Sequence, residues 1–72
     1  MTRITYSFGS DYRFNEFESD KTARAFEFIL AIRGIEDYSV MTRRLVITEQ
    51  GTLGYRWSLV RNCVNGVLEQ TN

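Results

Sequence analysis

Apolar and polar residues alternate strictly along two stretches of this chain, and that period of two restricts its fold more than any other feature. Residues 2–8 set the apolar side chains of Ile4, Tyr6 and Phe8 against the polar side chains of Arg3, Thr5 and Ser7. Residues 53–59 repeat the pattern, with Leu53, Tyr55, Trp57 and Leu59 against Gly54, Arg56 and Ser58. Successive side chains of a β-strand point to opposite faces of the sheet, so each stretch is predicted to be a strand with one buried face.

Two weaker alternations predict two more strands. Gly9, Ser10 and Asp11 are turn residues, and the alternation of residues 12–15 after them predicts the return strand of a hairpin. Residues 43–49 place Leu45 and Ile47 opposite Arg44, Val46 and Thr48, and the turn at residues 50–51 leads from there into the strand at residues 53–59.

The stretch between these strand pairs carries the start and stop signals of a helix. Ser19 or Asp20 can accept a hydrogen bond from the free amides of the first turn. Gly34 follows Arg33 at the usual left-handed stop, from which Ile35 can fold back on Leu30. We therefore expect a helix that ends near Arg33.

Two rules conflict over residues 59–70. Asn65 and Gly66 lie between Val64 and Val67, which is a strong signal for a two-residue hairpin turn. The apolar residues nevertheless fall on one half of a helical wheel: Leu59, Val60, Cys63, Val64, Val67 and Leu68. We favour a terminal helix capped by Ser58 over the hairpin.

The element order is then ββαββα. The sequence predicts a single α+β domain over residues 1–72, a two-layer sandwich of a four-stranded antiparallel sheet with helices on one face. A chain of 72 residues buries a small fraction of its surface, so its stability is expected to be marginal.

The missing residue types argue against catalysis. The chain has no histidine, the commonest general acid or base, and Cys63 is its single cysteine. Cys63 lies among apolar residues, where a thiol is usually inert, and one cysteine without histidine cannot anchor a zinc site. No glycine-rich phosphate loop is present. We expect no enzyme activity, no metal, no cofactor and no small-molecule substrate.

Arginine marks the first candidate surface. If all the alternating apolar residues face the helices, the opposite face of the sheet carries one arginine from each strand: Arg3, Arg13, Arg44 and Arg56. The chain has nine basic and nine acidic residues, so this face is expected to be a basic patch on a neutral molecule. Guanidinium groups bind carboxylates and phosphates in planar pairs, so these four arginines are predicted to engage an anionic partner surface.

The second candidate surface lies on the helix. Its apolar residues spread over roughly 200° of the helical wheel, which is wider than one sheet can cover. Phe28 and Ile32 are the residues predicted to form an exposed apolar patch, the usual mark of a partner or dimer contact.

Together these features predict a small non-enzymatic protein-binding or inhibitory module that occupies a target surface. By analogy of size and composition alone, such domains occur among phage and mobile-element accessory proteins, including the anti-CRISPR class. The expected partner is a protein, with a homodimer as one form. The alternative is a nucleic-acid-binding module that uses the arginine face. No apolar run spans a bilayer and no signal peptide is evident, so we expect no membrane contact and a cytoplasmic location.

Overall fold

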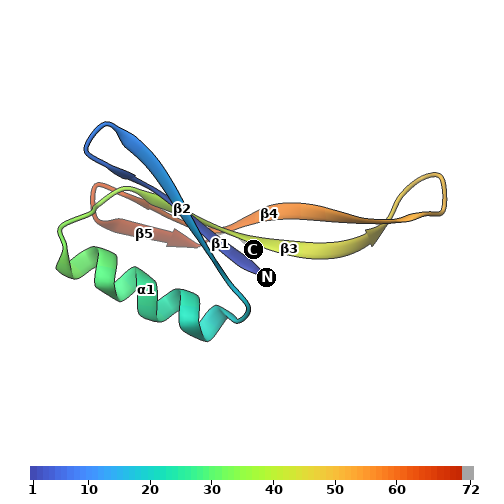
Figure 1. Ribbon diagram of the computed structural model, residues 1–72, viewed down its shortest axis with the longest axis horizontal. Helices are drawn as coiled ribbons and strands as arrows, with labels where there is room; N and C mark the ends of the chain where they lie inside the picture. The colour runs from blue at the N-terminus through green and yellow to red at the C-terminus, as the bar shows by residue number, and fades with distance from the viewer. Residues whose placement is uncertain (71–72) are drawn as a thin grey trace.

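The computed structural model describes residues 1–70 as one antiparallel sheet with a helix on one side (Figure 1). The sheet has five strands in the spatial order β2-β1-β3-β4-β5. In chain order the elements are β1 (Thr2–Phe8), β2 (Asp11–Phe17), α1 (Asp20–Ile32), β3 (Tyr38–Ile47), β4 (Leu53–Val64) and β5 (Val67–Gln70).

The prediction of a four-stranded sheet with a second helix is wrong. Residues 59–70 continue β4 to Val64, turn at Asn65 and Gly66, and return as β5. Asn65 has a φ of 53° and Gly66 a φ of 79°, the two positive values that a tight hairpin turn of this kind requires. The hairpin signal therefore outweighed the helical spacing, and the element order is ββαβββ.

A β-bulge explains why these residues resembled a helix. Val40 pairs with Arg61 and Met41 pairs with Leu59, which leaves Val60 as an extra residue in β4. The alternation is interrupted at Val60, and the segment carries apolar side chains on both faces of the sheet. Apolar residues on two faces of a bulged strand produced the spacing of a helical stripe.

The helix begins and ends where the sequence predicts. Ser19 caps it by accepting a hydrogen bond from the Thr22 amide at 3.4 Å. At the other end Gly34 has a φ of 76°, and the amides of Gly34 and Ile35 bond back to the carbonyls of Ala31 and Leu30. No helix within residues 1–70 has the length and apolar character needed to cross a membrane.

The core is small and lies between α1 and the sheet. Its fully enclosed cluster consists of Ile4, Val40, Ala23 and Leu30. Partly buried side chains surround this cluster: Tyr6, Phe17, Phe26, Ile35, Tyr38 and Val60. The ring of Phe26 packs on the rings of Tyr6 and Phe17 at centroid distances of 5.7 and 5.2 Å.

Candidate protein-binding surface

The register of the sheet places most of its remaining apolar side chains on the side away from α1. Directly paired residues of antiparallel strands point to the same side of the sheet. Ile4 is buried against α1, so the residues that pair with it also lie on the helix side. Phe8 pairs with Asp11 across the turn, which puts Tyr12 and Phe14 on the opposite side. We call the side away from α1 the outer face.

The prediction that the alternating apolar residues share one face is therefore wrong. Val40 in β3 pairs with Ile4 and faces the helix, so Leu45 and Ile47 of the same strand face outward. Their partners Tyr55 and Leu53 face outward with them. β1 thus turns its alternating apolar residues to the helix, whereas Leu45, Ile47, Leu53 and Tyr55 of β3 and β4 face outward.

Nine large apolar side chains of the outer face are exposed, by 40% to 82% of their surface. They are Tyr12, Phe14, Leu45, Ile47, Leu53, Tyr55, Leu59, Val64 and Val67. Isolated exposed apolar residues are normal on proteins, but clusters of them mark interaction sites, and the cross-strand pairs Leu45–Tyr55 and Ile47–Leu53 form such a cluster.

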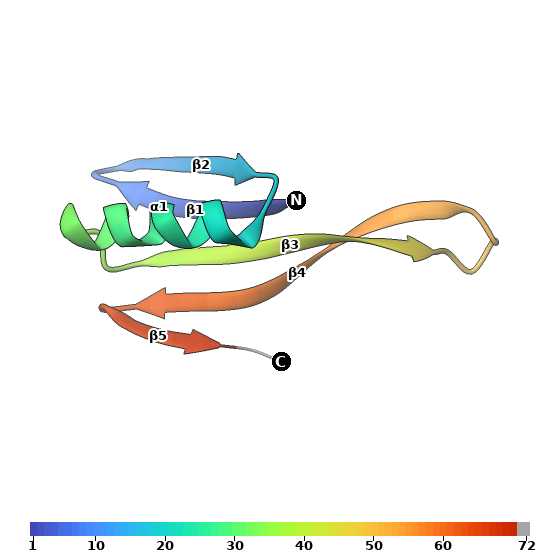
Figure 2. The same cartoon turned by 90° about the horizontal axis from the view of Figure 1, so that it is seen from below.

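Part of this face belongs to a two-stranded arm. Pairing of β1 with β3 ends at Thr42, and pairing of β5 with β4 ends at Arg61. Within residues 1–70, residues 43–57 therefore form a ribbon with no third β-strand beside them, and it projects beyond the rest of the sheet and the helix (Figure 2). We call these residues the arm.

The arm is amphipathic across its two faces. Its outer face holds the apolar cross-strand pairs Leu45–Tyr55 and Ile47–Leu53. Its back holds the cross-strand pair of Arg44 and Arg56, two like charges placed directly opposite each other. Water can solvate the back, whereas the outer face exposes apolar surface to it.

Two arginines of the outer face lie over its aromatic rings. The Arg3 guanidinium is 4.3 Å from the ring centroid of Trp57 and 4.9 Å from that of Phe14. Arg43 lies 4.2 Å from the ring centroid of Tyr55. These cation–π contacts hold the side chains down on the sheet and give the face a defined shape.

The four arginines predicted to form one patch do not share a face. Arg3 lies on the outer face, 3.6 Å from Glu16. Arg13 pairs with Tyr6 on the helix side, at the opposite end of the molecule from the arm, and Arg44 and Arg56 lie on the back of the arm. Of the four, the structure brings together only Arg44 and Arg56, because the short β1–β2 turn puts Arg13 on the side opposite to Arg3.

The helix patch is exposed as predicted. Phe28 and Ile32 keep 69% and 71% of their surface exposed, while Leu30 is buried in the core. Phe28 borders a shallow hollow with Leu68 of β5 and Tyr38 of β3. This patch is smaller than the outer face, since only Ile29 adds a further large exposed side chain from α1.

A buried ion cluster ties α1 to β4. Arg61, which is 4% exposed, donates from Nη2 to Glu27 at 2.8 Å and to Asp20 at 2.9 Å. Burial alone would lower the pKa of Arg61, but the hydrogen bonds with Glu27 and Asp20 outweigh it and raise that pKa. The hydrogen bond from Arg61, with a second from Arg24, lowers the pKa of Asp20. These groups act as a structural clamp.

Tyr38 lies beside this cluster. Burial raises the pKa of its phenol, and the neighbouring carboxylate of Glu27 raises it further. The phenol therefore stays protonated to a higher pH than that of an ordinary tyrosine.

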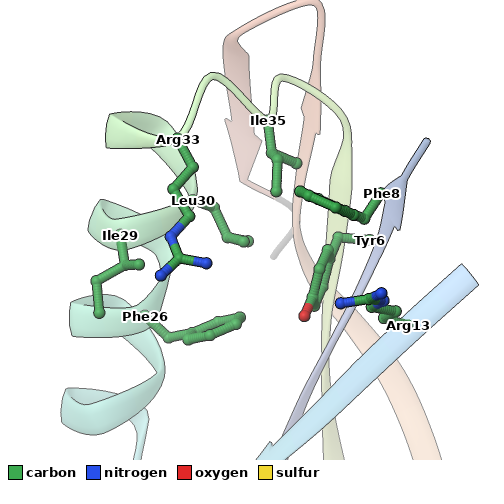
Figure 3. A pocket seen from close by; sticks show the side chains of 8 residues that line it. All are labelled: Tyr6, Phe8, Arg13, Phe26, Ile29, Leu30, Arg33 and Ile35. Atoms are coloured by element: carbon green, nitrogen blue, oxygen red, sulfur yellow. The ribbon is translucent and has the colours of Figure 1, made fainter.

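A cavity of about 230 Å³ opens on the helix side near the β1–β2 turn (Figure 3). Arg13 from β2 and Arg33 from the end of α1 line it together with the rings of Tyr6, Phe8 and Phe26. No carboxylate lines it, and neither arginine forms an ion pair within residues 1–70. The lining suits a small anionic group attached to an apolar body.

Sequence reasoning missed the outer face and Arg33. A signal for the outer face was present, because a two-residue turn such as Gly9–Ser10 pairs Phe8 with Asp11 and reverses the face of Tyr12. No sequence signal joins Arg33 to Arg13, since the helix end and β2 meet only in the folded chain.

Comparison of the chain with protein-family models, with curated proteins and with solved structures found no match. Within residues 1–70, no group of three or more potential ligand side chains is placed to hold a metal ion.

Proposed function

We propose that the chain is a small, non-enzymatic, cytoplasmic protein-binding module that acts by occupying a partner's surface with its outer face. One observation carries the proposal: nine exposed apolar side chains lie on one side of one sheet. Burial of apolar surface is the main favourable term in protein association, and aromatic residues with arginine are the typical residues of interface centres.

The proposal differs from the sequence-based expectation in the surface it uses. The sequence-based expectation gave the contact to four arginines and to two residues of α1, of which only Arg3 lies on the outer face: Arg3, Arg13, Arg44, Arg56, Phe28 and Ile32. The outer face exposes more apolar surface than α1, and it includes the arm, whose two strands have no other cover.

The test compares adjacent residues on opposite faces of β3. Proteins retained by the immobilised chain from an extract of its native host are identified for the wild type, for Leu45→Glu and for Arg44→Gln. We expect Leu45→Glu to lose the specific partner, because a carboxylate enters an apolar contact, and Arg44→Gln to keep it. Loss with Arg44→Gln and retention with Leu45→Glu would assign the contact to the back of the arm instead.

A nucleic-acid-binding module is the second candidate, and one observation favours it. The outer face places Arg3 against Phe14 and Trp57 and Arg43 against Tyr55, and aromatic rings with arginine stack the bases of single strands. Its exposed aliphatic side chains and its balanced charges favour a protein partner.

Fluorescence anisotropy with labelled single-stranded DNA and RNA separates the two candidates. A nucleic-acid site requires binding that weakens steeply with salt and that Phe14→Ala reduces by about tenfold or more. We expect no binding of either nucleic acid at 150 mM salt. Matching affinities for the wild type and Phe14→Ala would exclude stacking on this face.

A further inference from the structure

We infer that the occupant of the outer face is a second copy of this chain, packed sheet to sheet. This inference rests on the proposed function, because it names the partner of the same face. It is carried by the surface area of the molecule, by the charges of the outer face and by the length that a covering layer must have.

The accessible surface is larger than that of a compact monomer of the same mass. It measures 5527 Å², whereas a compact monomer of 8.4 kDa is expected to expose about 4,600 Å². The excess of about 900 Å² is close to the roughly 800 Å² that each partner buries in a standard interface. The excess accessible area therefore matches the area that one partner buries in a stable interface.

The charges of the outer face allow it to pack against a second copy of itself. In a two-fold symmetric contact each patch meets its own copy, so a patch with a large net charge would repel itself. The strands place two basic and two acidic residues on this face: Arg3, Arg43, Glu16 and Glu69. Arg3 and Glu16 already lie within 3.6 Å of each other, so the face meets its copy with balanced charge.

The arm requires a long covering layer. A two-stranded ribbon is marginally stable in water, and further exposed apolar side chains lie on the outer face of the main part of the sheet. A partner that covers both parts has to extend along a molecule whose longest dimension is 44 Å. A second sheet of the same length and strand period supplies such a layer, and two sheets pack about 10 Å apart.

The polar groups on the other side of the sheet agree with this arrangement. Arg44 and Arg56 stay on the back of the arm, where water solvates them in a sheet-to-sheet dimer. The helix and the buried Arg61 cluster also lie on the sides of the dimer that face away from the contact.

Sedimentation equilibrium of the purified chain between about 1 and 200 μM tests the inference. We expect a concentration-dependent shift from 8.4 kDa to twice that mass. Ile47→Glu and Leu53→Glu, on side chains that are 74% and 71% exposed, should each raise the dimer dissociation constant by at least about 100-fold. Ile32→Glu, on an equally exposed side chain of α1, is the matched control and should leave the constant unchanged.

Circular dichroism of each variant confirms that α1 is retained. A wild type that stays monomeric at 200 μM overturns the inference, and so does a dimer that Ile32→Glu dissociates while Ile47→Glu does not. A monomer whose host partner is still lost with Leu45→Glu overturns only the second-copy occupant and leaves the proposed function standing. If outer-face variants change neither mass nor capture, both proposals fail.

Discussion

At the scale of single residues, buried polar groups connect α1 to the sheet beside the apolar core. Arg61 and Glu27 are 4% and 8% exposed and are joined by three hydrogen bonds of 2.8 to 3.2 Å. A buried pair contributes little net stability relative to apolar residues, but removing one partner leaves the other charge buried without compensation. The cluster therefore links α1 to β4 through side chains.

Arg61→Leu is expected to destabilise the fold by about 3–5 kcal/mol, because the Glu27 carboxylate loses its buried partner. Urea denaturation followed by circular dichroism measures the change. Adding Glu27→Gln to Arg61→Leu should recover part of the loss. Arg24→Leu, which removes an exposed pair with Asp20, is the control and should cost less than about 1 kcal/mol. Equal effects of the two single variants would contradict the clamp.

A second prediction concerns Tyr38 and the stability of the fold at alkaline pH. Its pKa is raised in the folded chain above the ordinary 10.0, so above that pH the unfolded chain ionises first and is favoured. The contribution is present in full below pH 10 and is lost as the pH rises. We expect the urea midpoint to fall above pH 10 in the wild type and to fall less in Tyr38→Phe. Identical pH profiles for the two chains would show that Tyr38 does not couple folding to pH.

At the scale of elements, α1 and the C-terminal hairpin show how local signals compare with periodic ones. The Ser19 cap and the Gly34 stop predicted α1 because each acts within one turn of chain. The Asn65–Gly66 turn also acted locally, with both residues at positive φ. The helical spacing around it arose from a bulge at Val60, which a periodicity count cannot represent.

Gly66→Ala discriminates the hairpin from the helix that the spacing favoured. In the hairpin Gly66 has a φ of 79°, so alanine is expected to destabilise the fold by about 1–2 kcal/mol. In a helix the same change would stabilise it by about 1 kcal/mol, because alanine is the better helix former. Urea denaturation gives the sign of the effect, and a stabilised Gly66→Ala variant would contradict the hairpin.

At the scale of the whole molecule, a compact part and a projecting arm divide the chain. The core, α1 and the buried ion cluster lie at one end, and residues 43–57 extend from the other (Figure 2). The arm adds no residue to the buried cluster of Ile4, Ala23, Leu30 and Val40. We therefore expect the arm to serve association and the remainder to hold the fold.

Replacing residues 44–56 with an Asn-Gly turn shortens the arm without breaking its register, because Arg43 and Trp57 are paired. The shortened chain should keep the helical circular dichroism signal and unfold cooperatively, since the buried cluster is unchanged. Its self-association should weaken by about 100-fold, because the apolar pairs of the arm are gone. Full-strength dimerisation of the shortened chain, measured by sedimentation, would place the contact outside the arm.

The sequence by itself determined the properties that depend on neighbouring residues. These are the cap and stop of α1, the presence of strands at the alternating stretches, the strong turn signal at Asn65–Gly66, and the lack of histidine chemistry. Only the tertiary structure decided which face each strand turns to the helix. A strand's face depends on its register with a neighbour, and one residue of difference in a turn or one bulge reverses every side chain after it. For that reason the arginines predicted to share a face were separated. Ile4 and Tyr6 joined the core as predicted, whereas most of the other apolar strand residues assigned to it became exposed on the outer face.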